Sequence, residues 1–304
     1  MVASADQLAT SAGLAIFAQG GNAVDAAIAT NAAIAVTGPH LCGIGGDLFA
    51  LVHIDDPSGD GGPGETFALN ASGRAGSGAD PSALRAEGFT EIPFKLDVRS
   101  VTVPGCVDGW MALHDRFGSL PLDAILAPAR RLAAEGFPAS PLLVGSLRRL
   151  DATSRSNLAE LAEQANSTGA VVRRPGAALV LAALPVSGRD GFYLGAFGDG
   201  LLELGDGLFD ADDLGTVQAD WVEPLSASAF GVDLHTIGPN SQGYLTIAAA
   251  RLAERHDLPD DPDDPRWAHL LIEAATAAGF DRPDVLHERA DGNALVDTID
   301  QRLD

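Results

Sequence analysis

The residues that could carry nucleophilic chemistry occur in this 304-residue sequence without the spacing of known catalytic motifs. There is no G-x-S-x-G turn to expose a serine, no phosphate-binding Walker loop and no H-E-x-x-H pair for zinc. The two cysteines, Cys42 and Cys106, are too few for a disulfide framework, and we interpret them as small, semi-buried thiols. The motifs therefore identify no nucleophile together with its base.

The histidines and the acidic residues do not have the spacing of a metal site either. The histidines, none of which falls at ligand spacing, are His40, His53, His114, His235, His256, His269 and His287. His269 lies early in an amphipathic segment, and we expect it to be a packed or capping residue. The acidic run 206–213 lacks the mid-loop glycine and the terminal glutamate of a calcium loop, so we interpret it as a solvated turn followed by a helix start. We expect no metal and no cofactor.

The charge excludes two classes of partner. Asp and Glu number 42 against 19 Lys and Arg, which gives a formal net charge of −23. Such a chain is unsuited to neutralising phosphates, so we expect no nucleic acid and no membrane surface as partner. No apolar run is long enough to span a bilayer, and no signal peptide is visible at the N-terminus. We expect a cytoplasmic protein, or a secreted or periplasmic one if the N-terminus is truncated.

The elements that must position any site follow from the apolar periodicity. Helices are predicted from Ser4 to Gly20 and over 22–37, 106–117, 122–134, 140–164 with a break near Ser154, 176–184, 197–203, 242–255 and 266–280. Strands are predicted over 47–54, 66–71, 100–103, 216–222 and 230–237, the first two as a hairpin. Helices that alternate with a few paired strands indicate an α/β (α+β) fold, and no interdomain linker is visible.

Three local signals fix the ends of these elements. Ser4 and Gln7 form a capping box for the first helix. Asn22 is a good N-cap for the second helix. The run Gly43–Gly46 lacks the G-x-G-x-x-G spacing and precedes a strand, whereas a dinucleotide-binding loop follows one. We interpret it as a tight backbone turn.

Nine segments in a fixed order carry further information. They are Gln19–Ala27, Gly38–His40 with Gly43–Asp47, Val103–Gly105, Leu126–Ala129 with Glu135–Pro138, Gly191–Gly195, Asp213–Leu214, Glu223–Leu225, Pro239–Gly243 and His269–Ala274. In this order they resemble the gamma-glutamyltranspeptidase family, over about residues 1–282.

The resemblance implies a fold and a mechanism. The family consists of N-terminal-nucleophile hydrolases with a four-layer αββα core, made as a precursor that cleaves itself into a large and a small subunit. The new N-terminal threonine of the small subunit is the nucleophile, and its own α-amino group, with an ordinary pKa of about 8, is the base. This mechanism accounts for the missing triad. We expect residues 1–304 to be a single domain, the large subunit of a heterodimer, with no catalytic residue and no activity alone.

The resemblance also indicates where substrate binds. The family's substrate-binding arginine stands in a run that corresponds to residues 70–76, where Ser72 takes its place. Arg74 lies two residues further on, so on a strand it would face the same side. A guanidinium holds a carboxylate with two parallel hydrogen bonds, which a serine cannot do. Ser72 and Arg74 are therefore the candidate substrate-binding residues, and the alternative for Arg74 is a structural surface arginine.

The sequence is compatible with three functions. The first is transfer or hydrolysis of gamma-glutamyl amides, as in a gamma-glutamyltransferase or glutathione hydrolase. The second is a related amidohydrolase or acylase with another small amide substrate, for example oxamate. The third is an inactive fragment or a binding scaffold. In either enzyme, Gly43–Gly46 is expected to hold the sheet geometry near Ser72 and Arg74.

Overall fold

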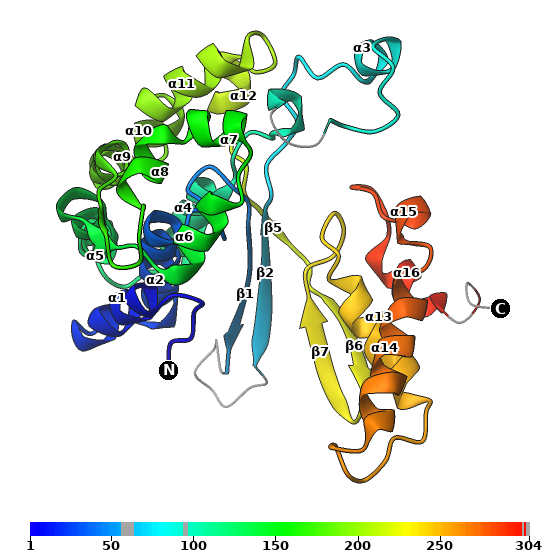
Figure 1. Cartoon of the computed structure of the whole chain (residues 1–304). Coiled ribbons are helices and arrows are strands. Elements are labelled where there is room, and N and C mark those ends of the chain that lie inside the picture. The colour runs from blue at the N-terminus through cyan, green and yellow to red at the C-terminus, as the bar shows by residue number, and fades with distance from the viewer. Residues whose placement is uncertain (56–63, 94–96, 300, 302–304) are drawn as a thin grey trace. The chain divides into compact units, whose positions relative to one another are not determined.

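The computed structural model describes residues 1–55, 64–93, 97–299 and 301, as mixed helix and strand (Figure 1). The chain divides into two compact units. Unit 1 comprises residues 1–48 and 71–219, and unit 2 comprises residues 49–70 and 220–304. The chain passes from one unit to the other three times. The single domain expected over residues 1–304 stays a prediction.

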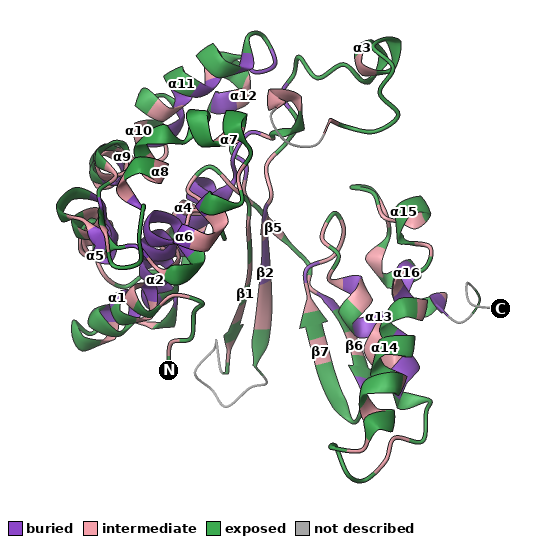
Figure 2. Ribbon diagram, in the orientation of Figure 1, coloured by how far each residue is buried: buried purple, intermediate pink, exposed green. Residues whose placement is uncertain are grey.

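Unit 1 is helical. Its helices are α1 (Gln7–Ala18), α2 (Ala23–Thr37), α3 (Pro81–Ala86), the 3₁₀ turn η1 (Val98–Ser100), α4 (Cys106–Phe117), α5 (Leu122–Glu135), α6 (Pro141–Arg148), α7 (Ala152–Asn157), α8 (Ala159–Gln164), α9 (Pro175–Ser187), α10 (Asp190–Tyr193), α11 (Ala196–Gly205) and α12 (Ala211–Gly215). A short ladder pairs β3 (Phe137–Pro138) with β4 (Val171–Val172). Helix α2 forms the centre of the core, since it is buried along most of its length and packs against α1, α4 and α5 (Figure 2).

The caps of the first two helices differ in how well the sequence predicts them. Asn22 caps α2 as predicted, in a capping box with Asp25. The predicted cap of α1 is wrong, because Asp6 accepts the Ala9 N–H at 2.9 Å while Ser4 donates its hydroxyl to the Asp6 carbonyl. Both side chains are good caps, and the carboxylate lies one helical turn before the donor.

Asp25 also ties α2 to the chain between α4 and α5. It is fully buried, and its carboxylate accepts the Asn22 and Ser119 N–H groups at 3.0 Å, the Leu120 N–H at 3.3 Å and the Ser119 hydroxyl. Burial alone would raise the pKa of Asp25, but these hydrogen bonds outweigh it, and the pKa lies below its ordinary value. The carboxylate is thus held in its ionised form.

The lowered pKa of Asp25 makes a pH-dependent contribution to stability. A carboxyl whose folded pKa lies below its unfolded pKa stabilises the fold above the unfolded value and loses that contribution as the pH falls through the folded value. We expect Asp25→Asn to lower the free energy of unfolding by about 1–3 kcal/mol at pH 7. The deficit should shrink as the pH falls below the ordinary value of 3.8. Urea unfolding at pH 7 and pH 3.5 measures it. Asp199→Asn, in the exposed first turn of α11, is the control, and a deficit that does not change with pH would contradict the assignment.

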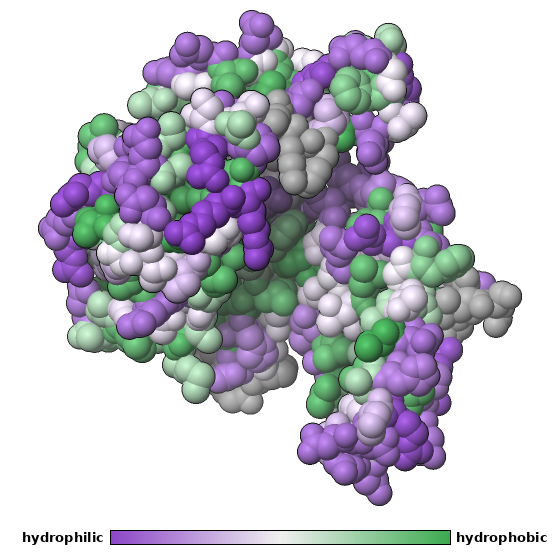
Figure 3. Space-filling view, in the orientation of Figure 1, coloured by the Kyte–Doolittle hydropathy of each residue, from purple (hydrophilic) through white to green (hydrophobic). Residues whose placement is uncertain are grey.

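Unit 2 combines strands with helices. Strands β1 (Leu48–Ile54), β2 (Glu65–Ala71) and β5 (Asp220–Val222) form a sheet in the order β1-β2-β5, and β2 pairs antiparallel with β5, Leu69 opposite Trp221. Strands β6 (Leu225–Ala229) and β7 (Val232–Thr236) form an antiparallel hairpin. The helices are α13 (Tyr244–Glu254), α14 (Pro265–Gly279), α15 (Arg282–Val285) and α16 (Gly292–Asp297). The acidic loop between α13 and α14 forms a hydrophilic end of this unit, at the lower right of Figure 3.

Several predicted elements differ in the structure. The strand expected over 100–103 is wrong, because the chain forms η1 and then bonds to the loop after β2. The strand expected over 216–222 is shorter and begins at Asp220, and the helix expected over 140–164 is three short helices. The hairpin of β1 and β2 is confirmed. None of the helices in the described ranges is long and apolar enough to cross a bilayer.

Candidate functional site

Both predicted substrate-binding residues lie in the loop that follows β2, residues 72–78, which we term the arginine loop. Strand β2 ends at Ala71, and Gly73 has a φ of +79°, which is outside the extended region. The expectation that Arg74 lies on a strand, on the same side as Ser72, is therefore wrong: side-chain alternation stops before these residues. Ser72 is half-buried and Arg74 is exposed.

Arg74 is bonded through both its backbone and its guanidinium. The backbone N–H donates to Gln218 Oε1 at 3.0 Å, and the carbonyl accepts the Val103 N–H at 2.8 Å. Nη1 donates to the Val217 carbonyl at 2.7 Å and to Gln218 Oε1 at 3.4 Å. The side chain is therefore oriented by residues more than 140 positions away in the sequence.

The second half of the arginine loop is held by the acidic run. Asp213 accepts the N–H and the hydroxyl of Ser77, both at 2.9 Å, and Asp210 accepts the same hydroxyl at 3.2 Å. Asp210 and Asp213 also form the capping box that starts α12. Burial alone would raise the pKa of Asp213. The hydrogen bonds from Ser77 and Asp210 outweigh this effect, so the pKa lies below its ordinary value. The predicted helix start is confirmed, whereas these two carboxylates hold the loop and are not merely solvated.

A third contact comes from the start of α4. A Cβ at Gly105 would lie 2.0 Å from the Ala71 carbonyl oxygen and 3.0 Å from the Gly73 nitrogen, so the two backbones touch. The Gly46 carbonyl accepts the N–H groups of Gly105 at 3.1 Å and Cys106 at 2.9 Å. The turn at Gly43–Gly46 thus holds the segment that packs against the arginine loop. The role expected of Gly43–Gly46, to hold the structure near Ser72 and Arg74, requires such a contact with the arginine loop.

Asp108 and Arg189 form an ion pair that contacts the backbone of Gln218, which we term the buried ion pair. Asp108, in the first turn of α4, is 2% exposed. Arg189 donates from Nε to Asp108 Oδ1 at 2.8 Å and from Nη2 to Oδ2 at 3.1 Å, a two-pronged contact. The Gln218 N–H completes the shell of Asp108 at 2.7 Å from Oδ2. The pair therefore connects α4, the start of α10 and the segment before β5.

Arg189 extends the same network. It donates to the carbonyls of Leu214, Gly215 and Thr216 at 3.0, 3.3 and 3.1 Å, and its guanidinium carbon lies 4.4 Å from the centre of the Tyr193 ring. Burial lowers the pKa of Arg189, but the hydrogen bonds and charge of Asp108 outweigh this effect, and the pKa is raised. Arg189 therefore keeps its positive charge beside Asp108.

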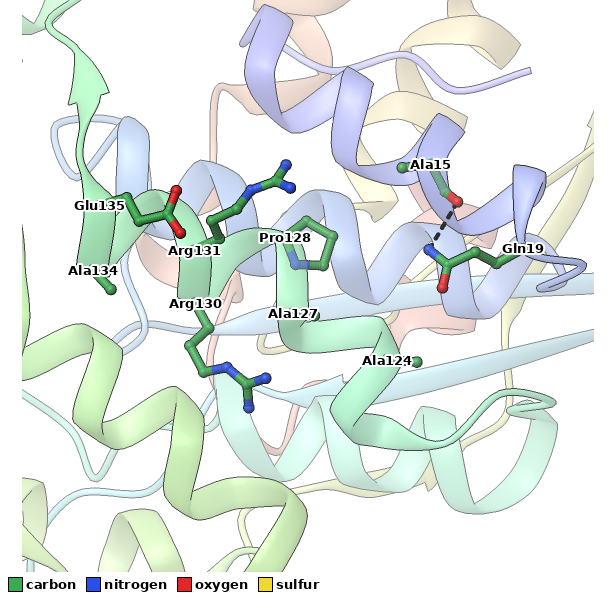
Figure 4. A pocket seen from close by; sticks show the side chains of 9 residues that line it. All are labelled: Ala15, Gln19, Ala124, Ala127, Pro128, Arg130, Arg131, Ala134 and Glu135. Carbon is green, nitrogen blue, oxygen red and sulfur yellow. Dashed lines mark hydrogen bonds between the residues drawn. The ribbon is translucent and has the colours of Figure 1, made fainter.

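Other candidate positions carry less chemistry. An open hollow of about 570 Å³ lies between α1 and α5, lined by Ala15, Gln19, Ala124, Ala127, Pro128, Arg130, Arg131, Ala134 and Glu135 (Figure 4). Gln19 donates to the Ala15 carbonyl of its own helix at 3.0 Å. His269 is exposed, so its predicted packing is wrong. Among the described residues, no three His, Cys, Asp or Glu side chains come together as a metal site.

Comparisons with known proteins find similar sequences and similar structures. The profile of the family described as Gamma-glutamyltranspeptidase matches residues 9–302. A glutathione hydrolase-like YwrD proenzyme of Bacillus subtilis is 31% identical over 95% of this chain and 55% of its own length. An oxamate amidohydrolase proenzyme of Klebsiella pneumoniae is 32% identical over 91% of this chain and 53% of its own. A gamma-glutamyltranspeptidase structure from Pseudomonas nitroreducens has a TM-score of 0.83 at 26% identity, over 99% of this chain and 92% of that one.

The fold is that of the N-terminal-nucleophile hydrolases, as its structural neighbours are gamma-glutamyltranspeptidases of that class. This confirms the fold class predicted from the sequence. The profile match covers nearly the whole chain, and the chain belongs to the gamma-glutamyltranspeptidase family. It spans about half the length of the curated relatives it matches.

Proposed function

We propose that this chain is the large subunit of an amide-cleaving enzyme whose nucleophilic threonine begins a second subunit. The observation that carries the proposal is the extent of the matches. The chain covers 55% and 53% of two relatives named as proenzymes, yet 92% of one chain in the Pseudomonas nitroreducens structure. A precursor cut near its middle into two subunits accounts for both proportions.

The reaction would be acyl transfer. The threonine hydroxyl adds to the substrate amide carbonyl as its α-amino group accepts the proton. The resulting ammonium group gives that proton to the amide nitrogen, the C–N bond breaks, the neutral amine leaves, and an ester remains on the threonine. Attack by water or by a second amine then releases the acyl group and regenerates the threonine. This chain supplies no group that forms or breaks a bond. Its part is to hold the substrate's carboxylate, for which Arg74 offers a planar donor fork fixed in the arginine loop.

The surface of unit 2 is suited to a second subunit. Strand β1 lies at an edge of the described sheet, and its Phe49 and Leu51 side chains are 41% and 42% exposed. An edge strand with exposed apolar side chains tends to associate with other strands unless it is covered. A small subunit that covers β1 would remove these residues from water.

The leading substrate class is the gamma-glutamyl amides. A second candidate is a short amide acid such as oxamate, because Ser72 and Arg74 depart from the family's arginine position and a relative is named oxamate amidohydrolase. A carboxylate lies several bonds from the scissile amide in the first class and beside it in the second. The distance between Arg74 and the threonine therefore decides between them.

The test uses the gene product that contains this chain together with the segment encoded after it. Mass spectrometry should find two polypeptides, the second beginning with threonine, and the product should hydrolyse gamma-glutamyl-4-nitroanilide or oxamate. Activity on oxamate alone would rule out the gamma-glutamyl assignment. A single uncleaved chain with neither activity would support the inactive fragment or scaffold.

Arg74 tests the substrate-binding part of this proposal. We expect Arg74→Ala to raise KM about 10- to 100-fold, since a hydrogen-bonded charge pair to the substrate is lost, with a smaller change in kcat. Arg74→Lys should recover only part of the affinity, because an ammonium cannot form the two-pronged contact. Steady-state kinetics on the better substrate measure both variants. Arg85→Ala is the matched control, since Arg85 is another arginine that donates from Nη1 to a backbone carbonyl. An unchanged KM in Arg74→Ala would return Arg74 to a structural role.

A further inference from the structure

Gln218 joins the arginine loop to the buried ion pair. Its side chain is 2% exposed and uses both ends of its amide. Oε1 accepts the backbone N–H of Arg74 at 3.0 Å and Nη1 of the same residue at 3.4 Å. Nε2 donates to the carbonyls of Thr216 at 2.8 Å and Asp213 at 3.3 Å. Because the donors lie on one side and the acceptors on the other, only one orientation of the amide satisfies them all.

The backbone of Gln218 is fixed as firmly as its side chain. Its N–H donates to Asp108 Oδ2 at 2.7 Å, and Arg189 holds the same carboxylate in a two-pronged contact. Arg189 also binds the carbonyls of Leu214 and Thr216 on either side of the turn that leads to Gln218. The pair of Asp108 and Arg189 thus fixes the backbone of Gln218, whose side-chain amide binds Arg74.

We propose that Gln218 is a positioning residue for substrate binding, which sets the direction of the Arg74 guanidinium and is itself held by Asp108 and Arg189. The proposal rests on the proposed function, in which Arg74 binds the substrate's carboxylate. A long, exposed arginine loses rotamer freedom when it binds a ligand. Because Gln218 and the Val217 carbonyl hold Nη1 in advance, that loss is reduced. Gln218 touches no reacting atom, and it acts through Arg74.

The structure offers a matched control for this role. Gln164, at the end of α8, accepts the backbone N–H of Arg173 on Oε1 at 2.8 Å and donates from Nε2 to the carbonyls of Arg173 and Glu160. It thus makes the same kind of contact with another arginine, outside the arginine loop and the buried pair. Gln164→Met removes these bonds without touching the proposed site.

The test compares KM and kcat for Gln218→Met, Gln164→Met, Arg74→Ala and the double variant Gln218→Met with Arg74→Ala. We expect Gln218→Met to raise KM about tenfold with kcat within about twofold, and Gln164→Met to change neither. In the double variant KM should be no higher than in Arg74→Ala alone, since both changes act through one guanidinium. A general structural role for Gln218 would instead add its effect to that of Arg74→Ala.

A second readout does not depend on activity. Amide hydrogen exchange at Arg74 should speed up at least tenfold in Gln218→Met, because its N–H loses its acceptor, and stay unchanged in Gln164→Met. If Gln218→Met does not fold, Gln218→Asn replaces it, because the shorter side chain keeps its polarity and withdraws the amide from Arg74. An increase in KM for Arg74→Ala but not for the Gln218 variants would overturn the positioning role alone. No amidase activity, or an unchanged KM in Arg74→Ala, would overturn the proposed function and this inference together.

Discussion

Asp108→Ala is expected to lower the free energy of unfolding by about 3–5 kcal/mol, because it leaves the largely buried guanidinium of Arg189 without its partner carboxylate. The side chain of Asp108 is 1% exposed and that of Arg189 is 19% exposed, so water cannot replace the lost carboxylate at full strength. The Gln218 N–H loses its acceptor in the same substitution. For a unit of about 200 residues, each kcal/mol lowers the melting temperature by about 2–4 °C.

Urea unfolding of Asp108→Ala measures this effect, and a surface pair supplies the control. Arg130 Nη1 lies 2.6 Å from Asp123 Oδ1, but the Asp123 side chain is 63% exposed. Because water can replace the lost contact, Asp123→Ala should change the free energy of unfolding by at most about 1 kcal/mol. The double variant Asp108→Ala with Arg189→Met should recover part of the loss, since no unpaired charge is then buried. A loss below about 1 kcal/mol in Asp108→Ala would show that water reaches Arg189 and that the pair does not anchor the loop.

Local signals in the sequence account for the elements that were predicted well. Helix α4 begins at Cys106 and ends at Phe117 as predicted, because Gly118 follows an amphipathic run. Helix α2 begins after Asn22, because that side chain is a good N-cap. The segment 100–103 has the apolar β-branched residues of a strand, yet the Val103 N–H bonds to the Arg74 carbonyl of a distant loop. A contact of that kind depends on the tertiary fold and leaves no mark on local periodicity.

The candidate site was predictable only in part, for the same reason. Ser72 and Arg74 were found through the family resemblance, whereas Asp108, Arg189 and Gln218 were missed. Asp108 lies 81 residues from Arg189 and 110 from Gln218, and no spacing rule joins such positions. One signal was available: Asp108 is a carboxylate among the buried residues of the apolar face of α4. A charge on such a face requires a partner, although the sequence does not say which arginine supplies it.

The second large effect is expected at Gly73, where the arginine loop turns. A Cβ there would lie 1.9 Å from the Val103 carbonyl oxygen, whereas real Cβ contacts stay beyond 3.0 Å. Gly73→Ala must therefore move one of two backbones by about 1 Å, and displacements of that size at a binding site lower kcat/KM about 100-fold. The residue also adopts a φ of +79°, which is unfavourable for alanine by about 1–2 kcal/mol.

Gly20→Ala separates these two causes. Gly20 has a φ of +87°, close to that of Gly73, but an added Cβ would meet nothing within 4 Å. The Gly20→Ala variant should therefore lose only the conformational part of the free energy of unfolding, about 1–2 kcal/mol, and should retain its activity. Gly73→Ala should lose about 1–3 kcal/mol more, because Val103 also donates its N–H to the Arg74 carbonyl, and a shift that relieves the clash strains that bond. Equal losses in the two variants, with kcat/KM unchanged in Gly73→Ala, would mean that the backbone can yield there without moving Arg74.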